Sequence, residues 1–149
     1  MKKRFSIKGF FKSISKKKAI NYLKKCFFMK PKPVGGVKVI YQHCMLLREL
    51  GFEAIPLMMG KYKGNFYGYE VECKKYEEVL KDITPSDIIV ATEFEPYQGL
   101  MFKNAKKVLF VQNWLGLSTR LKNNDSYKSY IDLGYDHVIT CSDYCTNFV

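Results

Sequence analysis

The sequence predicts a single α/β domain: a doubly wound, mostly parallel sheet of about six strands with flanking helices, preceded by a basic N-terminal helix. The length of 149 residues suits one domain, and the 47% hydrophobic residues are enough to form its core. Short apolar runs alternate with helical patterns along the chain, which is typical of strands joined by helical crossovers. Four of the apolar runs lack polar alternation, as expected for parallel strands that are buried on both faces.

Basic charge is concentrated at the N-terminus. Residues 1–32 contain twelve of the 25 Lys and Arg and no Asp or Glu, which leaves 13 basic and 14 acidic residues in the remainder. We therefore divide the chain into a basic amphipathic leader, residues 1–24, and a nearly neutral domain, residues 25–149. A nucleic-acid-binding domain normally spreads basic charge over its surface, so no nucleic-acid partner is expected.

The leader has the pattern of an amphipathic helix. Apolar residues recur at i, i+3, i+4 and i+7, with lysines every four residues on another face. We expect this helix to lie on an anionic membrane surface through Lys8, Phe10, Phe11, Lys12 and Ile14. A solvated tail and a helix packed on its own domain are the alternatives. Lysines interrupt every apolar stretch before it reaches the roughly 18 residues of a spanning helix, so the expected location is cytoplasmic, peripheral on the inner membrane face.

The first half of the domain reads as strand, helix, strand. Residues 26–29 form a compact apolar run, and residues 37–50 have a helical stripe that ends before Gly51. Residues 54–59 form the next apolar run. Pro56 interrupts it, and because proline cannot donate to a sheet, it indicates an edge or a strand end.

The second half continues the alternation. We expect strands at 69–73, 88–91, 108–111 and 137–141, helices at 76–81, 96–103 and 126–133, a loop at 113–125, and a last helix that begins at Ser142.

The sharpest local motif is the segment 33–37, PVGGV, between the first strand and the first helix. In a doubly wound sheet, ligands bind at the carboxyl ends of the strands. Glycines let the backbone approach a ligand, and free N–H groups at a helix start suit a phosphate. We therefore predict a phosphate-contacting loop at Gly35, Gly36 and Val37; the alternative is a tight turn that needs glycine only for its geometry. The segment is neither G-x-G-x-x-G nor a P-loop, which disfavours a nicotinamide dehydrogenase or a P-loop NTPase.

Polar or aromatic residues follow the later strands and are expected to share one edge. Glu93 is the one weak catalytic candidate, as a base, unless it caps the next helix. Asn113 binds either a sugar hydroxyl or its own loop backbone, and Trp114 either stacks on a sugar or is buried. Ser142 suits an N-cap. With Gln112, these residues make up the predicted cleft, which corresponds to the acceptor site in the family resemblance described below.

Cysteine and histidine indicate no further chemistry. The five cysteines are widely spaced without a C-x-x-C, so we expect reduced thiols and no metal. Two histidines and no G-x-S-x-G give no support to a hydrolytic triad.

Five segments together resemble a known family. They are 33–40 (PVGGVKVI), 46–54 (LLRELGFEA), 88–93 (IIVATE), 107–113 (KVLFVQN) and 134–142 (GYDHVITCS). In order and spacing they are similar to the N-terminal domain of family-4-like glycosyltransferases of the GT-B fold. The resemblance implies a Rossmann-like domain that holds the acceptor, with its glycine loop approaching the donor diphosphate. A second domain, expected to lie outside this chain, would bind the nucleotide sugar.

The resemblance implies hexosyl transfer from a nucleotide sugar to a glycan or lipid-linked acceptor, as in the synthesis of cell-envelope polysaccharide. No cofactor beyond the nucleotide-sugar co-substrate is implied. Many members place a catalytic histidine after a middle strand, where this sequence has Gln112 and Asn113. The chain is then expected to be a truncated or split enzyme that works with a separate C-terminal domain chain. The alternative is a non-catalytic binding module, either a pseudoenzyme or the partner subunit of a split glycosyltransferase.

Overall fold

The computed structural model describes residues 25–29, 35–58, 68, 72–121 and 129–147. The predicted leader, with its five membrane-contact residues Lys8, Phe10, Phe11, Lys12 and Ile14, lies outside these ranges.

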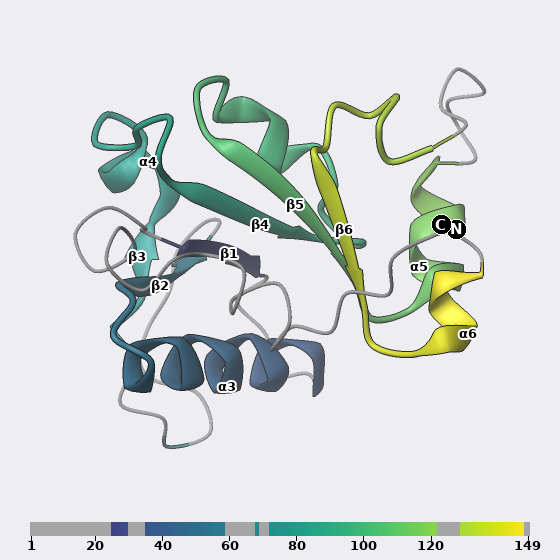
Figure 1. Cartoon of the computed structure of the whole chain (residues 1–149), viewed down its shortest axis with the longest axis horizontal. Helices are drawn as coiled ribbons and strands as arrows, with labels where there is room; N and C mark the ends of the chain where they lie inside the picture. The colour runs from purple at the N-terminus through teal and green to yellow at the C-terminus, as the bar shows by residue number, and fades with distance from the viewer. Residues whose placement is uncertain (1–24, 30–34, 59–67, 69–71, 122–128, 148–149) are drawn as a thin grey trace.

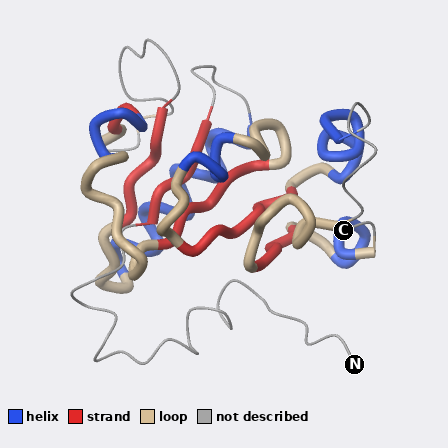
Figure 2. The backbone as a smooth tube through the Cα atoms, turned by 90° about the horizontal axis from the view of Figure 1, so that it is seen from above, coloured by secondary structure: helices blue, strands red, loops and turns tan. Residues whose placement is uncertain are grey.

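The strands are β1 (Lys25–Met29), β2 (Ala54–Met58), β3 (Lys74–Lys75), β4 (Ile88–Thr92), β5 (Lys106–Val111) and β6 (His137–Thr140). They pair side by side in the order β3-β2-β1-β4-β5-β6, and every pairing is parallel (Figures 1 and 2). The predicted α/β class with a parallel sheet is therefore confirmed. The order is consistent with a Rossmann-like sheet. The chain first builds outward from β1 to β3 and then restarts at β4, so the reversal of direction lies between β1 and β4.

Helices cover both faces of the sheet. Helix α3 (Gly35–Glu49) lies on one face, where its buried stripe packs against residues of β2, β4 and β5 (Figure 1). Helix α4 (Tyr76–Val79), the short 3-10 helix η1 (Gln98–Met101) and α5 (Trp114–Leu121) belong to the other face. The short helix α6 (Asp143–Thr146) follows β6. Strands β2 and β4 are buried at every residue and β5 at its last four, which explains their mostly apolar sequences.

Helix α3 ends where the sequence predicts. Its buried residues recur every three or four positions: Val37, Ile40, Tyr41, Cys44 and Leu47. Gly51 has a φ of 83°, and the N–H groups of Gly51 and Phe52 donate to the carbonyls of Arg48 and Leu47 at 2.9 Å each. A left-handed residue of this kind satisfies the last carbonyls of a helix, and glycine adopts that conformation at least cost.

Pro56 lies inside β2, at a position that tolerates a missing donor. Strand β3 pairs with Leu57 and Met58 but does not extend to Pro56, so within the described ranges one side of β2 has no partner strand there. Strand β2 is nevertheless not an edge strand, because it lies between β3 and β1, and Pro56 is in the middle of it. The prediction of an edge or a strand end is therefore wrong, and only this local gap in pairing remains. The third strand was predicted at 69–73, but β3 comprises Lys74 and Lys75, and residues 69–71 lie outside the described ranges. Lysine on a short outer strand discourages pairing with another chain.

The prediction for residues 113–125 is wrong. They were expected to form a loop, but Trp114–Leu121 is helix α5. The Oδ1 atom of Asn113 accepts a hydrogen bond from the N–H of Leu115 at 3.0 Å, and this bond caps the helix. Gly116 and the polar residues after it conceal the helical pattern in the sequence. Conversely, residues 129–133 of the predicted helix 126–133 form bends and turns. Of the helix predicted at 96–103, only the 3-10 helix η1 (Gln98–Met101) is present.

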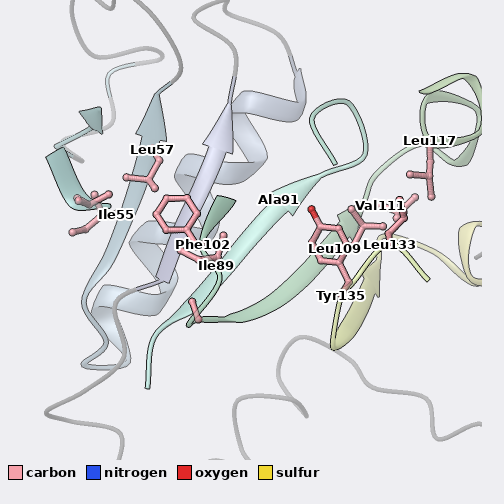
Figure 3. Packing of buried hydrophobic residues seen from close by; sticks show 12 residues of the cluster. Ile55, Leu57, Ile89, Ala91, Phe102, Leu109, Val111, Leu117, Leu133 and Tyr135 are labelled. Carbon is pink, nitrogen blue, oxygen red and sulfur yellow. The ribbon is translucent and has the colours of Figure 1, made fainter. Parts of the chain in front are cut away.

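The core on the α5 face extends from Ile55 and Leu57 to Leu117, and Leu109 and Tyr135 lie between these ends (Figure 3). The Tyr135 side chain is buried, and its hydroxyl donates a short hydrogen bond to the carbonyl of Pro96. Gly99 packs against this ring: a Cβ atom there would lie 2.7 Å from the Tyr135 hydroxyl and 3.0 Å from the Cβ of Ala91.

We expect Gly99→Ala to lower the free energy of unfolding by about 1–3 kcal/mol, because the buried and hydrogen-bonded Tyr135 cannot move aside. Urea unfolding followed by circular dichroism measures the change. Gly35→Ala, whose new methyl group would meet nothing within 4 Å, is the control. In a Tyr135→Phe background the cost of Gly99→Ala should fall, because the clashing hydroxyl is gone. Equal costs in both backgrounds would show that this contact does not determine the effect.

Candidate functional site

Because the strands are parallel, the residues that follow them meet at one edge of the sheet. Gly35 and Gly36 begin α3 after β1, Glu93 follows β4, Gln112 follows β5, and Ser142 follows β6. The predicted site residues therefore do lie along a single edge, which we call the carboxyl edge. Three consecutive strands of the sheet, β1, β4 and β5, contribute to its centre.

Gly36 and Gln112 are in direct contact across β4. The Nε2 atom of Gln112 donates to the carbonyl of Gly36 over 3.4 Å, and a Cβ atom on Gly36 would lie 3.3 Å from the same Nε2. The absence of a side chain at position 36 thus lets the Gln112 amide approach the backbone of α3. Val37 was predicted as part of the phosphate loop, but its side chain is buried among core residues on the α3 face. Only the backbone of Val37 remains available to a ligand.

Glu93 is the most unusual group at the carboxyl edge, because it is a carboxyl with no exposed surface. Its Oε1 accepts a hydrogen bond from the N–H of Asn113 at 2.9 Å. Its Oε2 is buried and has no hydrogen-bond partner among the described residues. Burial raises the pKa of Glu93, and backbone hydrogen bonds oppose that rise only in part. Glu93 therefore does not cap the segment that follows it; it fixes the end of β5 and the start of α5.

Asn113 and Trp114 lie between β5 and α5. The Asn113 side chain caps α5, so one of the two roles predicted for it, satisfying nearby backbone, is confirmed. Trp114 is half-buried, and its ring lies edge-on to that of Tyr144, with centroids 6.3 Å apart. Tyr144 is exposed. The carboxyl edge therefore carries an aromatic pair next to its polar groups.

Ser142 is the predicted N-cap. Its Oγ accepts a hydrogen bond from the N–H of Cys145 at 3.2 Å, at the start of α6. This bond occupies the hydroxyl locally and leaves Ser142 with a structural role in helix initiation.

Sequence reasoning missed two features of this edge. Gly116 admits the Phe94 ring, because a Cβ there would lie 2.9 Å from ring carbons, and no sequence pattern indicates such a contact. The other is a pair of thiols: the Sγ atoms of Cys141 and Cys145 are 3.7 Å apart. Their spacing, from a strand end to the first turn of a helix, was the available signal.

Neither a reactive His43 nor a metal-binding cluster is seen in the described part of the chain. His43 is half-buried on α3, with its ring 5.1 Å from that of Phe110, and burial lowers its pKa. It is thus a packing residue. No three His, Cys, Asp or Glu side chains within the described ranges gather closely enough to bind a metal ion. None of the described helices has the length and apolar character needed to cross a bilayer.

Comparison of the chain with models of known protein families finds no match, and comparison with solved structures finds none either.

Proposed function

We propose that this chain is the acceptor-side domain of a glycosyltransferase, which transfers a sugar from a nucleotide-sugar donor to a glycan or lipid-linked acceptor together with a donor-binding domain. The observation that carries the proposal is the contact between Gly36 and Gln112. It joins the residues after β1 and β5 across the end of β4, at the reversal of the strand order, where sheets of this kind bind ligands.

The carboxyl edge offers the groups that such a ligand needs. The first N–H groups of α3 have no partner within the helix and suit a donor phosphate. Gly35 is exposed, and Gly36 carries no side chain to block the approach. The amide of Gln112 is half-buried beside them, and the Trp114 ring offers an apolar face to a sugar.

Glu93 supports the site by holding its neighbours and has no open face for substrate. Its carboxyl is fully covered, so it fits the role of a positioning residue better than that of a catalytic base. By accepting from Asn113, it sets where β5 ends and where α5 begins. The Gln112, Asn113 and Trp114 side chains are placed by that junction.

We expect uridine diphosphate glucose, uridine diphosphate and inorganic pyrophosphate each to shift the backbone amide resonances of Gly36 and Gln112 in ¹⁵N-labelled full-length chain. Gly36→Val should weaken this binding about tenfold or more, equivalent to about 1.4 kcal/mol, because its side chain displaces the Gln112 amide and covers the N–H groups. Titration by nuclear magnetic resonance gives the dissociation constants.

Gln42→Val is the matched control, because it places the same β-branched residue at an exposed position of the same helix. It should bind all three probes as the native chain does. Shifts that map away from the carboxyl edge would contradict the proposed site. Because the nucleoside is proposed to be bound by the donor-binding domain, the three probes should bind through their phosphates with similar dissociation constants. Absence of these shifts for all three probes would contradict the proposal.

A further inference from the structure

The pair Cys141 and Cys145 forms a distinct chemical feature at the end of β6. Cys141 follows the strand, and Cys145 lies in the first turn of α6. Their Sγ atoms are 3.7 Å apart, and a disulfide requires about 2.05 Å, so the two sulfurs must move closer for the bond to form. The N-cap bond from Cys145 N–H to Ser142 holds the turn that brings the two sulfurs together.

The two thiols differ in access. Cys141 is exposed, and Cys145 is 4% exposed behind it. Both sulfurs face the carbonyl of Gln112, at 3.1 Å for Cys141 and 3.8 Å for Cys145. Among the other described cysteines, Cys44 is fully buried, and the Cys73 sulfur lies 2.8 Å from the hydroxyl of Tyr41. The C-terminal pair therefore combines an accessible thiol with a second thiol close to it.

We propose that Cys141 and Cys145 are a redox-active dithiol that reacts with small-molecule disulfides to form an intramolecular disulfide. This proposal does not depend on glycosyl transfer. An accessible thiol beside a resolving thiol is the usual arrangement in redox-sensitive cysteine sites.

The reaction has two exchange steps. The thiolate of Cys141 attacks one sulfur of the external disulfide, whose S–S bond breaks and releases one thiol molecule. The thiolate of Cys145 then attacks the Cys141 sulfur of this mixed disulfide and releases the second thiol molecule. Two protein thiols are oxidised, one external disulfide is reduced to two thiols, and the two protons leave with those thiols. Hydrogen bonding by Ser142 lowers the pKa of the Cys145 thiol, whereas desolvation raises the pKa of the Cys141 thiol. The first attack should therefore become faster as pH rises and more Cys141 thiolate forms.

Oxidation also changes the surroundings of Gln112. The disulfide has no S–H group, so the Gln112 carbonyl loses both of its sulfur donors. The side chain of the same residue contacts Gly36, so the dithiol lies next to a residue of the carboxyl edge. The carbonyl ¹³C resonance of Gln112 is a direct probe of this change.

The test treats folded full-length chain with glutathione disulfide, alkylates the remaining thiols and digests with trypsin. Both cysteines fall in the C-terminal peptide after Lys128. We expect this peptide to lose the mass of two hydrogens and to take up no alkylating reagent. The carbonyl resonance of Gln112 should shift at the same time, and dithiothreitol should reverse both changes.

Single variants separate the two steps. Cys145→Ser should trap one glutathionyl group on Cys141, and Cys141→Ser should leave Cys145 without an adduct because it is covered. Cys73→Ser should still form the disulfide. Circular dichroism checks that each variant is folded. If a variant does not fold, the result with the native chain alone decides the proposal. A native chain that stays reduced, or that gains glutathione without closing the disulfide, would overturn the proposal.

Discussion

Leu109→Ala is expected to lower the free energy of unfolding by about 2–5 kcal/mol. Leu109 has no exposed surface and lies in the middle of β5, paired with Ala91 of β4 on one side and Val138 of β6 on the other. Its side chain is part of the core on the α5 face (Figure 3). Alanine would leave a cavity that strands held on both sides cannot close. Domains of this size are stable by about 5–15 kcal/mol, so the loss would be a large share of the total.

Urea unfolding at fixed temperature measures this effect. Leu46→Ala is the matched control, because Leu46 lies on the outer side of α3 and is 55% exposed. The same substitution there should change the free energy of unfolding by no more than about 0.5 kcal/mol. Similar losses at the two positions would mean that Leu109 is not at the centre of the core.

In the native chain, ionisation of Glu93 is expected to lower the free energy of unfolding as pH rises. Glu93→Gln should abolish this loss. Burial raises the pKa of Glu93, so the folded chain holds this proton more tightly than the unfolded chain does. The contribution of Glu93 to the free energy of unfolding must then decrease as pH rises from the unfolded pKa, about 4.3, through the folded pKa, and become level above it. Glutamine has no proton to lose and keeps an oxygen that accepts from Asn113. The stability of the variant relative to the native chain should therefore increase with pH over that window.

Urea unfolding from pH 4 to pH 8 tests this difference. Glu53→Gln, at an exposed carboxyl, should follow the native pH profile. Glu93→Ala should be less stable than Glu93→Gln by about 1–3 kcal/mol at every pH, because the N–H of Asn113 loses its partner. A constant offset between Glu93→Gln and the native chain across the range would show that the burial of Glu93 does not perturb its ionisation.

Local sequence pattern was sufficient for several elements of the fold. The apolar runs at 88–91 and 108–111 became central strands, because a strand covered on both faces needs apolar residues at every position. The sequence also predicted the buried stripe of α3 and its end before Gly51, because helical period and glycine geometry are local properties. The N-cap at Ser142 belongs to the same group.

Helix α5 and the environment of Glu93 depended on contacts between segments far apart in the chain. Helix α5 contains Gly116, which weakens its helical pattern but gives room to Phe94 from the end of β4. Glu93 is a residue type that normally stays exposed, and only the fold shows that the N–H of Asn113 pairs with it in the interior.

The sequence by itself determined the α/β class, the positions of the central strands, the course of α3 and the residues that follow each strand, because period, apolar content and capping chemistry act over a few neighbouring residues. Tertiary structure alone decided that Gly36 meets Gln112, that Glu93 is buried, and that Cys141 and Cys145 face one carbonyl. These contacts follow from strand order and register, which place residues up to 76 positions apart within hydrogen-bond distance. No local pattern in the chain encodes that placement.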